Sequence, residues 1–384
     1  MPYIHRFFHN TKNSYFLFGP RGTGKTTWLE KYFENALFIN LLDTHLFRFL
    51  SSHPERLESM VLEAPQKIII VDEIQKIPEL LSIIHLLIEK KLGYQFILTG
   101  SSSRKLKRAG VDLLAGRALL KYLHPFMASE LKDKFNFQKA LAYGLVPINY
   151  MSSTPSDSLA AYIGLYLKEE VKAEGLVRNL GDFSRFLEIM SLSQGSPLNL
   201  NNIARECFVS RSLVENYLSI LYDLLLGFAL PVFTKRAKRA VTFHDKFYYF
   251  DTGVFQSLRP KGILDSTEQI SGIALETLIA QHLRAWNDYR AADGKLFYWR
   301  TKHGVEVDFI FYGNNEFTAI EVKSKTNVFE KDIRGLEIFG KDYPEAKLML
   351  LYQGDHRLKI KNVSCIPVSE FLLNLTPNKS LQEI

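Results

Sequence analysis

Short apolar runs alternate with helical patterns through the first third of the chain. The strands predicted from this alternation are Tyr15–Phe18, Ala36–Asn40, Lys67–Asp72, Gln95–Gly100 and Ala118–Leu123. Between the third and fourth of these runs, Pro78–Lys91 repeats apolar residues at helical spacing. Strands that alternate with helices predict a parallel sheet covered on both faces. The uninterrupted apolar run Ile68–Val71 is typical of a central strand in such a sheet.

The pattern changes twice farther along the chain. Met151–Ser158 is polar and rich in turn residues, which predicts a linker, and helical spacing then continues to Leu226. From about residue 271 a helix, Gly272–Trp286, precedes three strands with alternating polarity: Leu296–Thr301, Val305–Tyr312 and Phe317–Val322. We therefore predict three domains, at residues 1–130, 131–265 and 266–384.

Composition narrows the class of protein. The 384 residues are 46% hydrophobic and 23% charged, as expected of a globular protein with a substantial core. A net charge of +7 permits a polyanionic partner. Cys207 and Cys365 are far apart and lack metal-ligand spacing, which favours the reducing cytoplasm. No signal peptide and no apolar run of membrane-spanning length is present, so we expect a cytoplasmic protein without a membrane partner.

The strongest motif is the segment Gly19–Thr26, which joins the first predicted strand to a helical pattern. Gly19, Gly24, Lys25 and Thr26 satisfy the pattern GxxxxGK[ST], with Gly22 and Thr23 inside the loop. Glycines let backbone N–H groups curl around phosphate oxygens, and the following helix adds its own free N–H groups. Lys25 would reach the β- and γ-phosphates of ATP, and the Thr26 hydroxyl would ligate Mg²⁺.

Two carboxylates follow the most apolar strand. Asp72 at that edge would hold Mg²⁺, and Glu73 would deprotonate an attacking water. The alternative is a pair of acidic residues that merely cap a helix. A later strand, Phe96–Thr99, ends at Gly100 and Ser101. Either Thr99 or Ser101 would contact the γ-phosphate or the water, and a plain serine-rich turn is the competing interpretation.

Residues 1–130 resemble an AAA+-type ATPase domain, and specifically a bacterial and archaeal group in which this module precedes an uncharacterised C-terminal region. The stretches that carry the resemblance are Gly19–Thr26, Ile69–Gln75, Leu98–Ser102, Leu114–Arg117, and Leu123–Phe126 with Glu130. The resemblance implies that Lys25 and Thr26 bind phosphate and metal, that Asp72 binds Mg²⁺ and that Glu73 is the base. It also implies that Arg117 is a γ-phosphate sensor or an arginine finger toward a neighbouring copy, which would require an oligomer. A surface salt bridge is the alternative for Arg117.

The middle region resembles a winged helix. Asn199–Glu206 and Arg211–Leu226 are predicted helices, and a basic hairpin tip, Thr234–Arg239, follows them. The strands predicted beside the tip are Ala240–Phe243 and Phe247–Phe250. Such a unit presents its second helix to DNA and its wing to phosphates. The same architecture also serves only to pack domains together.

A second set of charged residues lies in the C-terminal region. Asp308 interrupts an apolar strand, Glu321 and Lys323 project from one face of the next strand, and Glu276 lies on the preceding helix. This arrangement resembles the PD-(D/E)XK nuclease core. The resemblance implies that Asp308 and Glu321 bind a second divalent ion, Mg²⁺ or Mn²⁺, that Glu276 supports them and that Lys323 serves catalysis. The alternative is a structural domain whose charges pair with one another.

The sequence as a whole predicts an α/β protein: a P-loop NTPase sheet, a helical winged-helix region and an α/β restriction-endonuclease-like domain. The function predicted is ATP binding and hydrolysis on or near nucleic acid. The rival interpretations are a nucleotide-gated DNA-binding switch or scaffold without nuclease activity, and a defence- or toxin-linked nuclease in which ATP only sets conformation.

Overall fold

The computed structural model describes residues 3–100, 114–167, 177, 179–234, 244–260, 262, 266–290, 293–313 and 315–384. The chain falls into two compact units. The N-terminal unit comprises Phe8–His124 and Ile220–Leu226, and the C-terminal unit comprises Met1–Phe7, Pro125–Ser219 and Gly227–Ile384. The three domain boundaries taken from the sequence stay a prediction. Within the described parts of the chain, no helix combines the length and apolar character needed to cross a membrane.

The N-terminal unit is built on a five-stranded sheet in the order β2-β3-β4-β1-β5, with every neighbouring pair parallel. This confirms the parallel sheet predicted from the alternating pattern. The predicted strands are all present, with ends that agree to within one residue. They are β1 (Tyr15–Phe18), β2 (Leu37–Asn40), β3 (Ile68–Asp72), β4 (Gln95–Gly100) and β5 (Leu119–Tyr122).

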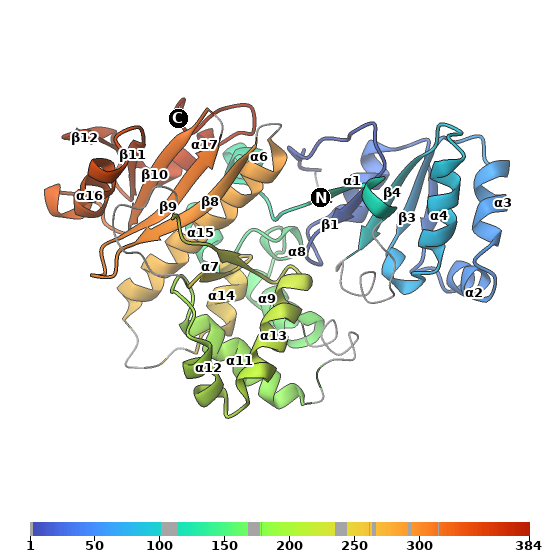
Figure 1. The fold of residues 1–384 in the computed structure, drawn as a ribbon, viewed down its shortest axis with the longest axis horizontal. Coiled ribbons are helices and arrows are strands. Elements are labelled where there is room, and N and C mark those ends of the chain that lie inside the picture. The colour runs from blue at the N-terminus through green and yellow to red at the C-terminus, as the bar shows by residue number, and fades with distance from the viewer. Residues whose placement is uncertain are drawn as a thin grey trace. The chain divides into compact units, whose positions relative to one another are not determined.

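Helices cover both faces of this sheet (Figure 1). On one face, Phe16 and Phe18 join a buried cluster with residues of the helices α2 (Thr44–Ser52), α3 (Arg56–Glu63) and α4 (Leu80–Glu89). On the other face, Trp28 of helix α1 (Lys25–Tyr32) packs edge-on against Phe8, with ring centroids 4.8 Å apart, and Phe8 also contacts Tyr15. Successive strand residues point to opposite faces, so the apolar run of β1 serves both layers. Short 3₁₀ turns, η1 (Ile74–Lys76) and η2 (Leu114–Gly116), complete the unit.

The C-terminal unit contains a six-stranded sheet in the order β12-β13-β11-β10-β9-β8. The strands β8, β9 and β10 are antiparallel, whereas β10, β11 and β13 are parallel. Their bounds are β8 (Gly294–Arg300), β9 (Glu306–Gly313), β10 (Phe317–Lys323), β11 (Lys347–Tyr352), β12 (Leu358–Ile360) and β13 (Val363–Pro367). The first three agree with the predicted strands.

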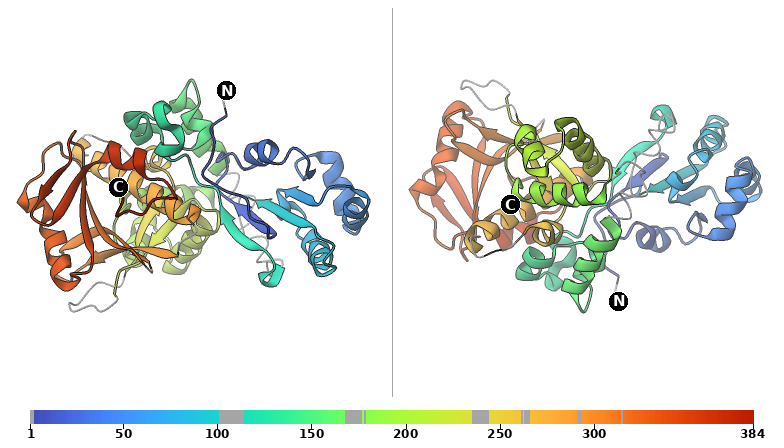
Figure 2. Two further views of the ribbon diagram at one scale, coloured as in Figure 1. Left: turned by 90° about the horizontal axis from the view of Figure 1, so that it is seen from above. Right: turned by 90° about the horizontal axis from the view of Figure 1, so that it is seen from below.

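A long helix and a short one pack against this sheet (Figure 1, Figure 2). Trp286 of α15 (Thr267–Tyr289) meets Phe311 of β9, with ring centroids 4.9 Å apart. Phe339 of α16 (Arg334–Asp342) meets Trp299 of β8 at 5.4 Å. The 3₁₀ turn η5 (Glu330–Ile333) leads into α16, and α17 (Val368–Asn374) follows β13.

The remaining part of the C-terminal unit is mostly helical and includes a two-stranded ribbon. Its elements are α6 (Ala128–Leu131), η3 (Lys132–Lys134), α7 (Phe137–Tyr143), α8 (Pro147–Tyr150), α9 (Pro155–Ala161), η4 (Tyr162–Leu167), α11 (Leu180–Leu192), α12 (Leu200–Cys207), most of α13 (Arg211–Asp223), β6 (Gly227–Leu230), β7 (Lys246–Tyr249) and α14 (Thr252–Leu258). The end of α13, from Ile220 onward, belongs to the N-terminal unit. Helices α12 and α13 match the two helices predicted for the winged-helix region.

One sequence expectation in this region needs correction. The predicted linker at residues 151–158 contains the start of α9, because Pro155 occupies the first turn of the helix and Leu159 is buried. Strand β7 pairs with β6, which precedes the basic tip. The tip residues 235–239 and the strand predicted at 240–243 lie outside the described residues.

Candidate functional site

The loop Gly19–Thr26 joins β1 to α1 as the sequence predicts. Gly22 and Gly24 have φ of 82° and 90°, left-handed values that L side chains adopt only with strain. The Thr23 hydroxyl donates to the carbonyl of Pro20 at 2.8 Å. Lys25 is buried, and its Nζ lies 2.6 Å from the Gly19 carbonyl oxygen. The loop therefore folds around the ammonium of its own lysine at the carboxyl end of the central strands.

Asp72 connects this loop to two neighbouring strands. It is fully buried at the end of β3, and its Oδ2 accepts a hydrogen bond from the Thr26 hydroxyl at 2.9 Å. Its Oδ1 accepts a second bond from the Thr99 hydroxyl of β4. Because β4 lies between β3 and β1, the ends of these three strands meet at one edge of the sheet. A hydroxyl and a carboxylate oxygen side by side are ligands that suit Mg²⁺.

Glu73 takes a strained backbone conformation. Its φ of 61° and ψ of 45° lie in the left-handed region, which is uncommon for a residue other than glycine. Its N–H donates to the Thr99 hydroxyl at 3.1 Å, and its carboxylate accepts from the side-chain amide of Gln75. A Cβ at Gly100 would lie 2.6 Å from Gln75 Oε1, so a larger residue there would displace the Gln75 side chain. Thr99 therefore holds the backbone of Glu73, and Gln75 holds its carboxylate.

Ser101 and Arg117 were also predicted to lie near the nucleotide. Ser101 lies outside the described residues. Thr99, its alternative, is fully buried and bonded to Asp72 and to the backbone of Glu73. Arg117 forms an ion pair with Glu89 at the end of α4, and its side chain is 38% exposed. The structure thus contains the surface salt bridge proposed as the alternative for Arg117, and its role toward phosphate stays a prediction.

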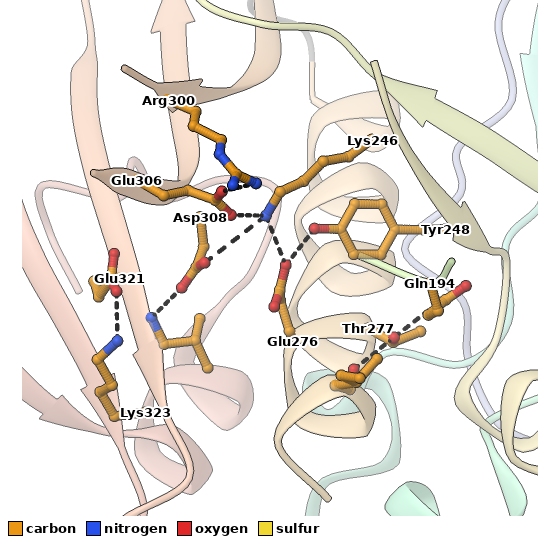
Figure 3. A network of polar contacts seen from close by, with 12 residues as sticks. Gln194, Lys246, Tyr248, Glu276, Thr277, Arg300, Glu306, Asp308, Glu321 and Lys323 are labelled. Atoms are coloured by element: carbon orange, nitrogen blue, oxygen red, sulfur yellow. Dashed lines mark hydrogen bonds and ion pairs between the residues drawn. The ribbon is translucent and has the colours of Figure 1, made fainter. Parts of the chain in front are cut away.

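Asp308 and Glu321 lie opposite each other in the C-terminal sheet (Figure 3). Strands β9 and β10 are antiparallel with Phe309 paired to Ile320, so the next position places Asp308 opposite Glu321. Opposed residues of an antiparallel pair share a face. The backbone pairing of β9 with β10 ends at Phe309 and Ile320. Beyond that point, Asp308 Oδ2 accepts a hydrogen bond from the backbone N–H of Val322 at 2.8 Å.

The lysine and the glutamate predicted beside this pair have different partners. Lys323 Nζ lies 2.6 Å from Glu321 Oε1, so these two close an ion pair along β10. Glu276 of α15 accepts from the Tyr248 hydroxyl, and its Oε1 lies 3.2 Å from Lys246 Nζ. Lys246 and Tyr248 both come from β7 and were not singled out in the sequence.

The acidic residues are strongly perturbed by their burial. Burial raises the pKa of Asp308 well above its usual range, and the carboxylates of Glu321 and Glu276 raise it further. Burial also raises the pKa of Glu321, against the opposing effect of Lys323. No group of three or more His, Cys, Asp or Glu side chains that could hold a metal ion occurs among the described residues. A second divalent ion is therefore not supported by the arrangement of these side chains as they stand.

Sequence reasoning missed four residues of these sites. Gln75 lies in the stretch Ile69–Gln75, two positions after Glu73, and its polar side chain in an apolar segment was a usable signal. Glu306 precedes Asp308 by two positions and so shares its strand. Lys246 and Tyr248 carried no signal, because a lysine and an aromatic residue in a short strand are ordinary on a half-exposed surface.

Comparison with protein families divides the chain into three matched segments. Residues 11–132 match the model described as "AAA domain". Residues 134–265 match "Domain of unknown function (DUF8612)", and residues 271–371 match "Domain of unknown function (DUF4143)". The AAA match covers the loop, Asp72 and Glu73.

Similar proteins span most of the chain. "Uncharacterized protein Rv2008c" of Mycobacterium tuberculosis is 24% identical over 323 residues, which is 82% of this chain and 71% of that protein. "Uncharacterized protein MJ1544" of Methanocaldococcus jannaschii is 24% identical over 365 residues, which is 86% of this chain and 79% of that protein.

Two solved structures show weak likeness. "Replication initiator DnaA bound to AMPPCP and single-stranded DNA" is 13% identical with a TM-score of 0.27, over 55% of this chain and 82% of that one. "Crystal structure of protein VC1899 from Vibrio cholerae" is 13% identical with a TM-score of 0.22, over 88% of this chain and 96% of that one. At such TM-scores neither likeness bears on fold or function. The family match to residues 11–132 and the geometry of the loop support an ATP-binding protein with an AAA-type N-terminal domain.

Proposed function

We propose that the protein is a Mg²⁺-dependent ATPase whose N-terminal unit hydrolyses ATP. The observation that carries this proposal is a continuous polar chain at the ends of β1, β3 and β4. It runs from the Thr26 hydroxyl through Asp72 to Thr99 and the backbone of Glu73. Buried polar networks of this kind fix side-chain positions, as a phosphoryl-transfer site requires.

Each residue of the loop has one role in this proposal. The Lys25 ammonium neutralises charge on the β- and γ-phosphates, and the backbone N–H groups of Gly22, Thr23 and Gly24 cradle their oxygens. The residues that would hold Mg²⁺ are Thr26 and Asp72, and a bound magnesium would offset the charge that develops on the phosphate oxygens.

Glu73 is the general base. Its carboxylate accepts a proton from water as the water oxygen bonds to the γ-phosphorus, and the bond from that phosphorus to the β–γ bridging oxygen breaks to release ADP. Gln75 and Thr99 hold Glu73 in place for this transfer. The strained backbone of Glu73 supports a catalytic assignment, because such strain persists at sites where the surrounding structure enforces it.

The test is ATP turnover by the purified full chain with Mg²⁺ and with EDTA, beside Lys25→Ala. We expect turnover only with Mg²⁺ and loss of ATP binding in Lys25→Ala. A matched control is Lys31→Ala, which removes a lysine from the other end of α1. Turnover by Lys25→Ala at the wild-type rate would refute the proposal.

A second candidate function is a metal-dependent nuclease in the C-terminal unit. It is favoured by the opposed carboxylates of Asp308 and Glu321 with Lys323 beside them. In addition, Glu321 is 8% exposed, and its buried Oε2 has no hydrogen-bond partner among the described residues. An orphaned carboxylate oxygen suits a hard cation, and Asp308 and Glu321 would be the ligands of a second Mg²⁺ or Mn²⁺. The test is Mn²⁺-dependent cleavage of plasmid DNA, with Asp308→Asn expected to abolish it.

Nucleic-acid binding is proposed for the helices α12 and α13 with the basic stretch that follows them. Support comes from the helix pair and from the charges of Lys235, Arg236, Lys238 and Arg239. Reversing these four residues to Glu should weaken DNA binding and reduce its salt dependence. If both stay at wild-type values, the region is better assigned to domain packing. Without cleavage activity, DNA binding that depends on ATP would indicate a nucleotide-gated switch.

A further inference from the structure

Lys246 is a buried lysine surrounded by acidic side chains. Its side chain is 1% exposed, and its Nζ lies 3.2 Å from Glu276 Oε1 and 3.9 Å from Asp308 Oδ1. It also forms an ion pair with Glu306 (Figure 3). The side chain is therefore a fixed ammonium ion inside the unit.

The backbone around Lys246 holds this ammonium in place. Lys246 begins β7, where it pairs with Leu230 of β6. The ribbon is attached to the edge of the six-stranded sheet through Tyr298 of β8, whose N–H donates to the Pro231 carbonyl at 2.9 Å and whose hydroxyl donates to the His244 carbonyl. Lys246 Nζ lies 5.3 Å from the centre of the Tyr298 ring. The ammonium is thus presented to the sheet by a separate ribbon.

The acidic cluster consists of Glu276, Glu306, Asp308 and Glu321. Three of these carboxylates face Lys246, and the fourth, Glu321, pairs with Lys323. Arg300 also pairs with Glu306, at 3.2 Å. Lysine and arginine side chains therefore already pair with all four carboxylates of the cluster.

We propose that Lys246 is a built-in cation of this cluster and competes with a divalent metal ion for its carboxylates. The proposal rests on the nuclease-like site proposed above and adds a residue that limits it. A metal ion would bring two positive charges to carboxylates whose charge lysine and arginine already offset, and like charges at such distances repel. The orphaned Glu321 Oε2 is the position left open to a cation.

The test measures binding of Mn²⁺ alone to the full chain by calorimetry, for the wild type and Lys246→Met. Methionine keeps the length of the side chain and removes its charge. We expect Lys246→Met to bind Mn²⁺ about tenfold or more tightly than the wild type, since a unit charge has been removed beside the ligands. The matched control is Lys325→Met, which removes a lysine that pairs with Asp332 outside the cluster and should leave binding unchanged.

A second variant covers the case in which Lys246→Met fails to fold. Lys246→Met with Glu306→Gln removes one negative charge along with the ammonium and keeps Glu276, Asp308 and Glu321 as ligands. We expect it, too, to bind Mn²⁺ more tightly than the wild type. If the folded variants bind Mn²⁺ no more tightly than the wild type, the proposal is overturned. If the wild type nevertheless cleaves DNA, the proposed nuclease function is supported without a role for Lys246. If the variants bind Mn²⁺ more tightly but do not cleave DNA, only the proposed competition between Lys246 and the metal ion is supported.

Discussion

Thr99→Val tests the polar chain of the nucleotide site with the smallest change in shape. Valine keeps the β-branched form and removes the hydroxyl that donates to Asp72 and accepts from the Glu73 N–H. Thr99 is fully buried, so no water replaces these bonds without rearrangement. We expect the variant to be less stable and to hydrolyse ATP more slowly, because both acidic residues lose a fixed partner.

The magnitude follows from the two bonds. A hydrogen bond to a charged group contributes about 1.5–3 kcal/mol, and an unpaired buried N–H costs about 1–3 kcal/mol. Because the site relaxes in part, we expect Thr99→Val to lower the free energy of unfolding by about 2–3 kcal/mol. This loss lowers the melting temperature of the N-terminal unit by about 5–10 °C. The same loss of positioning at Glu73 would lower kcat by about tenfold or more.

The assay is differential scanning fluorimetry beside steady-state ATP turnover. Thr99→Ser is the matched control, because it keeps the hydroxyl and should retain most of both properties. Wild-type melting temperature and kcat in Thr99→Val would show that the chain from Thr26 to Glu73 does not organise the site.

Two further predictions concern the C-terminal unit. Glu130→Ala should lower the free energy of unfolding by about 3–5 kcal/mol, because it removes the carboxylate that pairs with the buried Arg6 guanidinium. Glu58→Ala, a control in the N-terminal unit, breaks the exposed pair with Lys90 and should change the free energy of unfolding by less than about 1 kcal/mol. Burial raises the pKa of Asp251 to about 6. The folded state therefore holds a proton that the unfolded state releases near pH 4, and stability falls by about 2 kcal/mol as the pH rises from 4 to 6. Asp251→Asn should remove this fall in thermal melts recorded across that range, and an unchanged pH dependence would contradict the assignment.

The parts of the fold that could be predicted are those that depend on local pattern. The strands of the N-terminal sheet are apolar runs bounded by turns, and each was found to within one residue at either end. The opposition of Asp308 and Glu321 followed from strand alternation and a short hairpin. The linker predicted at residues 151–158 was wrong, because a polar stretch with proline is also typical of the first turn of a helix.

The features of the sites that could not be predicted from the sequence depend on contacts between distant segments. Lys246 meets Glu276 and Asp308 only because the β6–β7 ribbon attaches to the edge of a sheet formed 50 or so positions later. Glu73 has a left-handed backbone and is bonded to Thr99 and Gln75. No residue type in the motif predicts this backbone conformation. Long-range ion pairs and local strain are set by tertiary structure, which periodicity does not encode.

The most direct test of the central claim measures ATP binding and ATP turnover by Glu73→Gln. Glutamine preserves the size of the side chain but cannot accept the proton of the attacking water. We predict that this variant binds ATP with wild-type affinity and loses turnover by a factor of about 100 or more. Hydrolysis of ATP by Glu73→Gln at the wild-type rate would contradict the account.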